Sequence, residues 1–211
     1  HPGAFAKLSR TPIRLEAPAP QLGADRVLLD QAARRPQLPS GPKRRQAVLL
    51  EGLKVADFSW VGAGPLVSKD LANLGATVVH VESDKKVDPL RYVPPWKDRI
   101  PNPATGHTPV NFNQSKLGLA LDLSHPEARA IAHRLVDWAD VVIESFTPGT
   151  AEKLGIDWET LSAKKPGLVM LSSCMRGQTG PERRYTAFGL QGAALSGFVG
   201  VQQYTSIGRM A

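Results

Sequence analysis

The stretch from residue 52 to residue 82, GLKVADFSWVGAGPLVSKDLANLGATVVHVE, constrains this chain more than any other. Leu53 to Phe58 is a short apolar run with the composition of a buried strand, and Thr77 to Val81 is a second run rich in β-branched residues. Between the runs, a loop with two glycines leads into Pro65, which suits the first turn of a helix. This order predicts two parallel strands joined by a right-handed helical crossover.

The helix of this unit has a predicted apolar face. Leu66, Leu71 and Leu74 fall on one side of a helical projection, with Val67 beside them. Gly75 is a suitable helix stop.

Downstream, strands and helices continue to alternate. Further strands are predicted at 117–123, 140–144 and 168–173, and Ser124 with Glu127 predicts a capping box at the start of a helix. The intervening stretch 83–109 holds six prolines, so we expect no regular element there, and a loop of this length is usually functional or mobile. The alternation predicts an α/β fold with a doubly wound, mostly parallel sheet.

The charge of the chain is concentrated at its start. The net charge is +7, but residues 1–48 hold nine Lys or Arg against three Asp or Glu, whereas the remainder is nearly balanced. Residues 31–48 combine prolines with basic residues, which is linker composition, and we place a domain boundary near residue 48. The excess charge therefore indicates a solvated linker, and we expect no nucleic-acid partner.

The lengths of the apolar runs and the cysteine content narrow the class of protein further. No apolar run approaches the roughly 20 residues of a membrane helix, so no membrane partner is expected. Cys174 is the only cysteine, which excludes an intrachain disulfide and favours a reducing, cytoplasmic location.

The common catalytic and phosphate-binding motifs are absent. Gly62 to Pro65 lacks the third glycine of a dinucleotide fingerprint and the Gly-Lys-Ser/Thr of a P-loop. The histidines have no metal-ligand spacing, so we predict no metal site and expect surface or capping roles for them. Cys174 follows a strand, where a lone cysteine is more often packed than nucleophilic.

Four loops remain as candidates for a binding site. We place them at the carboxyl ends of strands, at 61–65, 112–116, 144–149 and 176–181, where parallel sheets form ligand crevices. With the short helix that follows the third of them, they supply two lysines and two phenylalanines, a mixture that suits a ligand with phosphates and a flat base: Phe112, Lys116, Phe146 and Lys153.

Several motifs together resemble the family III CoA-transferases of the CaiB/BaiF type, which include formyl-CoA, carnitine and bile-acid CoA-transferases and α-methylacyl-CoA racemases. The matching stretches are LEGLKVADFSWVGAGP at 50–65, LANLGATVVHVE at 71–82, DP-LR at 88–91, NQSKLGLALDLSHPEAR at 113–129, ADVVIESFTPGTAEKLGIDWETL at 139–161 and GQTGP at 177–181. The match covers about residues 50–200 in the right order.

The resemblance implies a domain organisation. Residues 49–211 are then the Rossmann-like, CoA-binding N-terminal half of one copy. Residues 1–30 resemble the C-terminal end of an upstream copy, an extended tail, and 31–48 link the two, as in a tandem fusion. Subunits of this family form interlocked ring dimers, so the implied partner is a second family III copy, fused or separate.

The resemblance also implies a reaction. CoA passes from an acyl-CoA thioester to a carboxylic acid through a covalent intermediate on an aspartate, with CoA as substrate and no resident cofactor. That aspartate is expected beyond Ala211, so no catalytic residue is assigned here and this segment alone is expected to be inactive. CoA contacts carried over by position are Phe112, Lys116, Phe146 and Lys153, the lysines toward phosphates and the phenylalanines around adenine.

Departures from the family pattern leave an alternative open. Phe188 stands where racemases carry an acid/base histidine, and Gly62, Ser83 and Leu117 replace larger or charged residues of relatives. The alternative is a catalytically degenerate half that completes the ring of a partner subunit. Core packing for Phe112 and Phe146, and a solvated surface for Lys116 and Lys153, also remain alternatives for the four site residues.

Overall fold

The computed structural model describes residues 8–12, 24 and 48–198. The chain divides into two units, 1–46 and 47–211, and the helices and strands that follow belong to the second. The predicted tail and linker, 1–30 and 31–48, lie outside the described residues except at these few positions.

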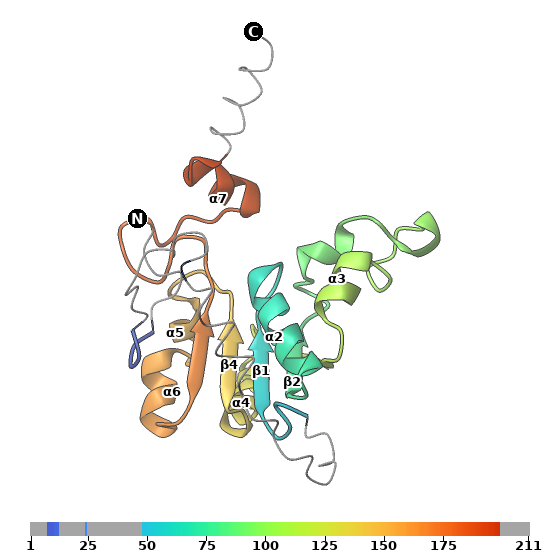
Figure 1. Ribbon diagram of the computed structural model, residues 1–211. Helices are drawn as coiled ribbons and strands as arrows, with labels where there is room; N and C mark the ends of the chain where they lie inside the picture. The colour runs from blue at the N-terminus through green and yellow to red at the C-terminus, as the bar shows by residue number, and fades with distance from the viewer. Residues whose placement is uncertain (1–7, 13–23, 25–47, 199–211) are drawn as a thin grey trace. The chain divides into compact units, whose positions relative to one another are not determined.

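Five parallel strands form a single sheet in the order β3-β2-β1-β4-β5 (Figure 1). The chain builds β1, β2 and β3 toward one edge and then returns to place β4 beside β1, which puts the switch in direction between β1 and β4. The predicted doubly wound α/β fold is thereby confirmed. The strands are β1 (Lys54–Phe58), β2 (Thr77–Glu82), β3 (Leu117–Ala120), β4 (Val141–Glu144) and β5 (Val169–Ser172).

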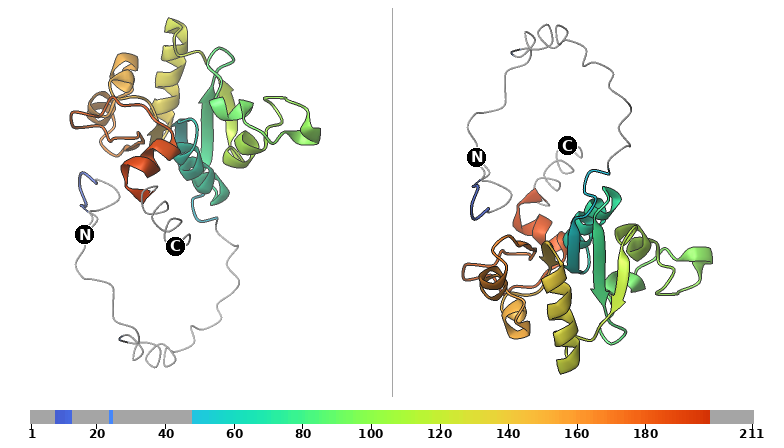
Figure 2. Two further views of the ribbon diagram at one scale, coloured as in Figure 1. Left: turned by 90° about the horizontal axis from the view of Figure 1, so that it is seen from above. Right: turned by 90° about the horizontal axis from the view of Figure 1, so that it is seen from below.

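Helices cover both faces of the sheet, and α2 and α4 lie on opposite sides (Figure 2). Alternate residues along β1 point to opposite faces, so Val55 packs under α2 whereas Ala56 and Phe58 pack under α4. The helical elements are α2 (Ala63–Asn73), η1 (Pro89–Tyr92), η2 (Lys97–Arg99), α3 (His107–Phe112), α4 (Pro126–Trp138), α5 (Thr150–Leu154), α6 (Trp158–Lys164) and α7 (Gly189–Leu195). No helix in residues 48–198 or the other described positions is long and apolar enough to cross a membrane.

The predicted apolar face of α2 is wrong except at Leu71, which is partly buried and packs against the core under this helix. The buried residues of α2 are the small ones, Gly64, Pro65, Ser68 and Ala72, whereas Leu66, Val67 and Leu74 are exposed. Small residues allow the helix axis to approach the sheet closely, and the buried face of α2 is partly polar because it covers a charged group on β1.

Two smaller expectations are also wrong. His125 is the N-cap of α4, and Ser124 instead hydrogen-bonds to Asp122, so the predicted capping box does not form. The stretch 83–109 contains the 3₁₀ turns η1 and η2 and the start of α3, although its prolines keep these elements short. Trp96 pairs with Gly106 by an antiparallel bridge, which closes this stretch on itself.

Candidate functional site

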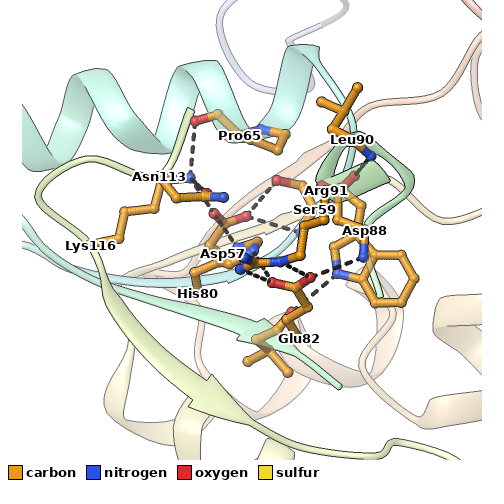
Figure 3. Close-up of polar contacts among 12 residues, drawn as sticks. Asp57, Ser59, Pro65, His80, Glu82, Asp88, Leu90, Arg91, Asn113 and Lys116 are labelled. Atoms are coloured by element: carbon orange, nitrogen blue, oxygen red, sulfur yellow. Dashed lines mark hydrogen bonds and ion pairs between the residues drawn. The ribbon is translucent and has the colours of Figure 1, made fainter. Parts of the chain in front are cut away.

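The centre of the site is a buried carboxylate, Asp57, on the face of β1 that α2 covers (Figure 3). One carboxylate oxygen accepts hydrogen bonds from the backbone and hydroxyl of Ser59, at 3.0 and 2.5 Å. The other accepts from the Ser68 hydroxyl at 2.6 Å, the Lys116 ammonium at 3.0 Å and Nδ1 of His80 at 3.1 Å. Asp57 and His80 are register partners on neighbouring strands, which is why their side chains meet.

These contacts keep the Asp57 carboxyl ionised. Burial alone would raise the pKa of Asp57, but the hydrogen bond and charge of His80, together with Lys116 and Ser59, hold that pKa well below its usual range. An ionised carboxylate only accepts hydrogen bonds, so Nδ1 of His80 carries the hydrogen. Nε2 of His80 is buried and has no hydrogen-bond partner among the described residues.

The ammonium of Lys116 joins three segments. Its acceptors are Asp57 on β1, the carbonyl of Pro65 in the first turn of α2 at 3.0 Å, and the side chain of Asn113 at 2.9 Å. The side chain is 1% exposed, and this burial lowers the pKa of Lys116. The charge of Asp57 acts in the other direction but does not outweigh the burial. All three ammonium hydrogens are used, so Lys116 fastens the start of α2 to β1.

Beside this cluster lies an open pocket of about 520 Å³. One wall is formed by the edge strand β3, by Lys116 just before it and by His80 of the neighbouring β2. The other wall is the segment that follows β2. That second wall is held by Arg91, which donates to both oxygens of Glu82 at 2.6 and 2.7 Å. Burial alone would raise the pKa of Glu82, but the hydrogen bonds and charge of Arg91 lower it. The same contact raises the pKa of Arg91.

The structure places the four predicted binding residues in two pairs. Phe112 ends α3 and Lys116 precedes β3, whereas Phe146 follows β4 and Lys153 lies on α5. The strands β1 and β2 stand between the pairs. Phe146 is partly buried and packs against the core under α4, and Lys153 is exposed.

One part of the predicted crevice is wrong. The stretch 112–116 precedes β3 and therefore lies at the amino end of that strand, not at its carboxyl end. The side chain of Lys116 nevertheless extends to the first turn of α2, because its ammonium bonds to Pro65. The loops that follow β1, β4 and β5 are at the carboxyl edge as predicted.

Asp57 and the role of His80 were missed by sequence reasoning. The expectation of surface or capping histidines is wrong for His80, which is 4% exposed and bonded to Asp57. The available signal was an ionisable residue inside each of two apolar runs, because a buried ionisable group requires a partner. Burial raises the pKa of the Cys174 thiol.

Across residues 48–198 and the other described positions, no group of three His, Cys, Asp or Glu side chains is arranged to hold a metal ion.

A second buried carboxyl group, Glu144, ends β4 beside the switch point. It is 2% exposed and accepts a hydrogen bond from the backbone of Phe146 at 2.6 Å, which fixes the start of the loop that carries this phenylalanine. Burial raises the pKa of Glu144, outweighing the hydrogen bonds from Ser172 and Phe146.

We expect Glu144→Gln to gain stability over the wild type as the pH rises. The pKa of Glu144 is higher in the folded protein than in the unfolded chain, where it lies near 4.5. The carboxyl therefore contributes its full stabilisation below the unfolded pKa, and this stabilisation is lost as the pH rises through the folded pKa. Glutamine keeps an acceptor for Phe146 and carries no charge. Urea unfolding between about pH 4 and about pH 8 measures the difference, with exposed Glu51→Gln as control. A difference independent of pH would contradict the raised pKa.

The fold and the site together define a doubly wound α/β protein with an open pocket between β3 and the segment that follows β2. The profile of CoA-transferase family III matches residues 50–208. The chain belongs to this family.

Individual relatives agree with the family. The succinyl-CoA–D-citramalate CoA-transferase of Chloroflexus aurantiacus is 38% identical over 148 residues, 70% of this chain and 36% of the relative. Subunit BbsE of the succinyl-CoA:(R)-benzylsuccinate CoA-transferase of Thauera aromatica is 40% identical over 136 residues, 64% of this chain and 33% of the relative. The chain thus spans about a third of the length of these relatives.

A solved structure confirms the architecture. The crystal structure of a CAIB/BAIF family protein from Brucella suis superposes with a TM-score of 0.63 at 34% sequence identity, covering 70% of this chain and 39% of that one.

Proposed function

We propose that this chain supplies the CoA-binding part of an enzyme that transfers CoA between an acyl-CoA thioester and a carboxylic acid. The observation that carries the proposal is the family match over residues 50–208, which includes the pocket beside Lys116 and the loops after β1 and β4. The relatives named above are CoA-transferases for succinyl-CoA and organic acids, which supports this substrate class. CoA is then a substrate, and no resident cofactor is needed.

The four predicted residues would divide the work of binding. Lys153 is exposed on α5 and is the proposed phosphate contact, with Phe146, which follows β4, as the proposed neighbour of the adenine. Phe112 lies with Lys116 on the other side of β1 and β2, so it is proposed to contact a different part of the ligand. Lys116 uses its ammonium hydrogens internally, so its proposed contribution to CoA binding acts through the position of the first turn of α2.

The chemical step belongs to an aspartate outside the described residues. Its carboxylate attacks the thioester carbonyl, and CoA leaves as thiolate. The thiolate then attacks the aspartyl carbonyl of the mixed anhydride, which forms an aspartyl-CoA thioester and releases the donor acid as carboxylate. The acceptor carboxylate attacks this thioester and expels CoA as thiolate, which then attacks the acceptor carbonyl of the new anhydride and releases the aspartate. A second family III copy, fused through the linker 31–48 or separate, is the proposed partner, and the cytoplasm the proposed location.

We expect Lys153→Ala to weaken CoA binding roughly three- to tenfold, because one charge-assisted contact to a phosphate is lost. Isothermal titration of CoA into the intact protein measures this, with exposed Lys164→Ala as the matched control. Pantetheine, which lacks the phosphates and the adenine, should bind both variants like the wild type. Equal CoA affinity in the wild type and Lys153→Ala would remove Lys153 from the site. If the wild type binds no CoA, the degenerate structural half becomes the better interpretation.

A further inference from the structure

The loop between β1 and α2 has an unfavourable backbone conformation at Val61. Its φ angle is +73°, in the left-handed region that β-branched residues rarely adopt. Such a conformation persists only where surrounding groups hold it. The neighbouring Trp60 is held from β4, since its backbone N–H donates to the hydroxyl of Ser145 at 2.8 Å.

Val61 is held by a buried carboxylate from a different segment. Its backbone N–H donates to one oxygen of Asp88 at 2.9 Å, and the other oxygen accepts from the backbone of Leu90 at 2.9 Å. Asp88 is 3% exposed, so neither bond is shared with bulk water. The two oxygens of one side chain therefore connect the first glycine loop to the 3₁₀ turn η1.

Asp88 is itself held in place. Its backbone N–H donates to Glu82 at 3.0 Å, and Arg91 grips the same carboxylate of Glu82 (Figure 3). A chain of contacts thus runs from the wall of the pocket, through Glu82 and Asp88, to the backbone of Val61 at the switch point.

We propose that Asp88 is a positioning residue that sets the conformation of the β1–α2 loop for CoA binding. The inference rests on the proposed function, because it assumes that this loop forms part of the CoA site. Asp88 touches the backbone of the loop, so it acts on the ligand through Val61 and the start of α2.

The sign of the expected effect separates positioning from simple electrostatics. CoA is an anion, so removing a nearby negative charge would by itself strengthen CoA binding. Asparagine has the shape of aspartate, but one of its two terminal groups is a donor. It therefore leaves either Val61 or Leu90 without an acceptor, and the loop relaxes toward other conformations.

We expect Asp88→Asn to raise the dissociation constant of CoA about tenfold, as the loss of a buried hydrogen bond to a charged group would. We also expect the Val61 amide to exchange its hydrogen at least tenfold faster without CoA, while core amides such as Val142 keep their protection. Isothermal titration and amide hydrogen exchange on the intact protein provide the two readouts. Asp70→Asn, the same charge change on the exposed side of α2, should alter neither.

Each outcome decides a separate question. An unchanged or tighter CoA dissociation constant in Asp88→Asn, with normal binding by the wild type, would overturn the positioning role. Unchanged exchange at Val61 would overturn it as well, whatever CoA does. Absence of CoA binding by the wild type would overturn the proposed function, and the exchange of Val61 would still decide whether Asp88 holds the loop.

Discussion

Lys116→Met is expected to lower the free energy of unfolding by roughly 3 kcal/mol, because it leaves the Asp57 carboxylate buried without its ammonium partner. Methionine has nearly the same length and fills the same space, so the loss comes from charge and hydrogen bonds. Ser59, Ser68 and His80 still donate to the carboxylate, which keeps the effect near the lower end for a broken buried pair. Urea unfolding with a two-state fit measures the change.

A double-mutant cycle assigns the effect to the pair. Replacing both partners, Asp57→Asn with Lys116→Met, removes the uncompensated charge and should recover most of the lost stability. Lys85→Met provides a control at an exposed ion pair with Asp122 and should change stability by no more than about 0.5 kcal/mol. Additive effects of the two single changes would show that the pair is not coupled.

Gly64→Ala is expected to cost about 2 to 3 kcal/mol by overpacking. A Cβ atom at this position would lie 2.3 Å from Cβ and 2.5 Å from Oγ of Ser59. Ser59 is fully buried and bonded to Asp57, so it has no room to move away. The first turn of α2 must then lift from the sheet, and the melting temperature and the urea midpoint should both fall.

The same loop supplies the matched control. A Cβ atom at Gly62 would meet nothing within 4 Å, and the backbone there has a negative φ angle. Gly62→Ala should therefore change stability by less than about 1 kcal/mol, the usual scale for a helix N-cap. Equal destabilisation by the two substitutions would mean that the tight contact between α2 and Ser59 is absent in solution.

The order of strands and helices was predictable from the sequence, because each apolar run is bounded by glycine, proline or polar residues. The strand at 54–58 follows such local signals closely. Helix faces were harder to predict. The rule that leucines mark the buried side holds for Leu71 but fails for Leu66 and Leu74, because α2 covers a carboxylate and needs small residues and a hydroxyl there.

The site was less predictable than the fold because its contacts join segments that are far apart in the chain. Lys116 and Asp57 are 59 residues apart, and Val61 and Asp88 are 27 apart. Local patterns identify the residue types but not these pairings. The family resemblance identified Lys116 by its motif. Its buried partner, Asp57, could be identified only from the register of the strands, which places Asp57 beside His80.

The shared carboxylate of Asp57 has a consequence for how this sequence can vary over evolutionary time. Its partners lie on β2, on α2 and just before β3, so a replacement at 57 removes the acceptor that His80, Ser68 and Lys116 share, and a replacement at 80 or 116 removes one of its donors. Substitutions at these positions are tolerated only in particular orders or together. Residues 57, 80 and 116 should therefore covary among homologous sequences.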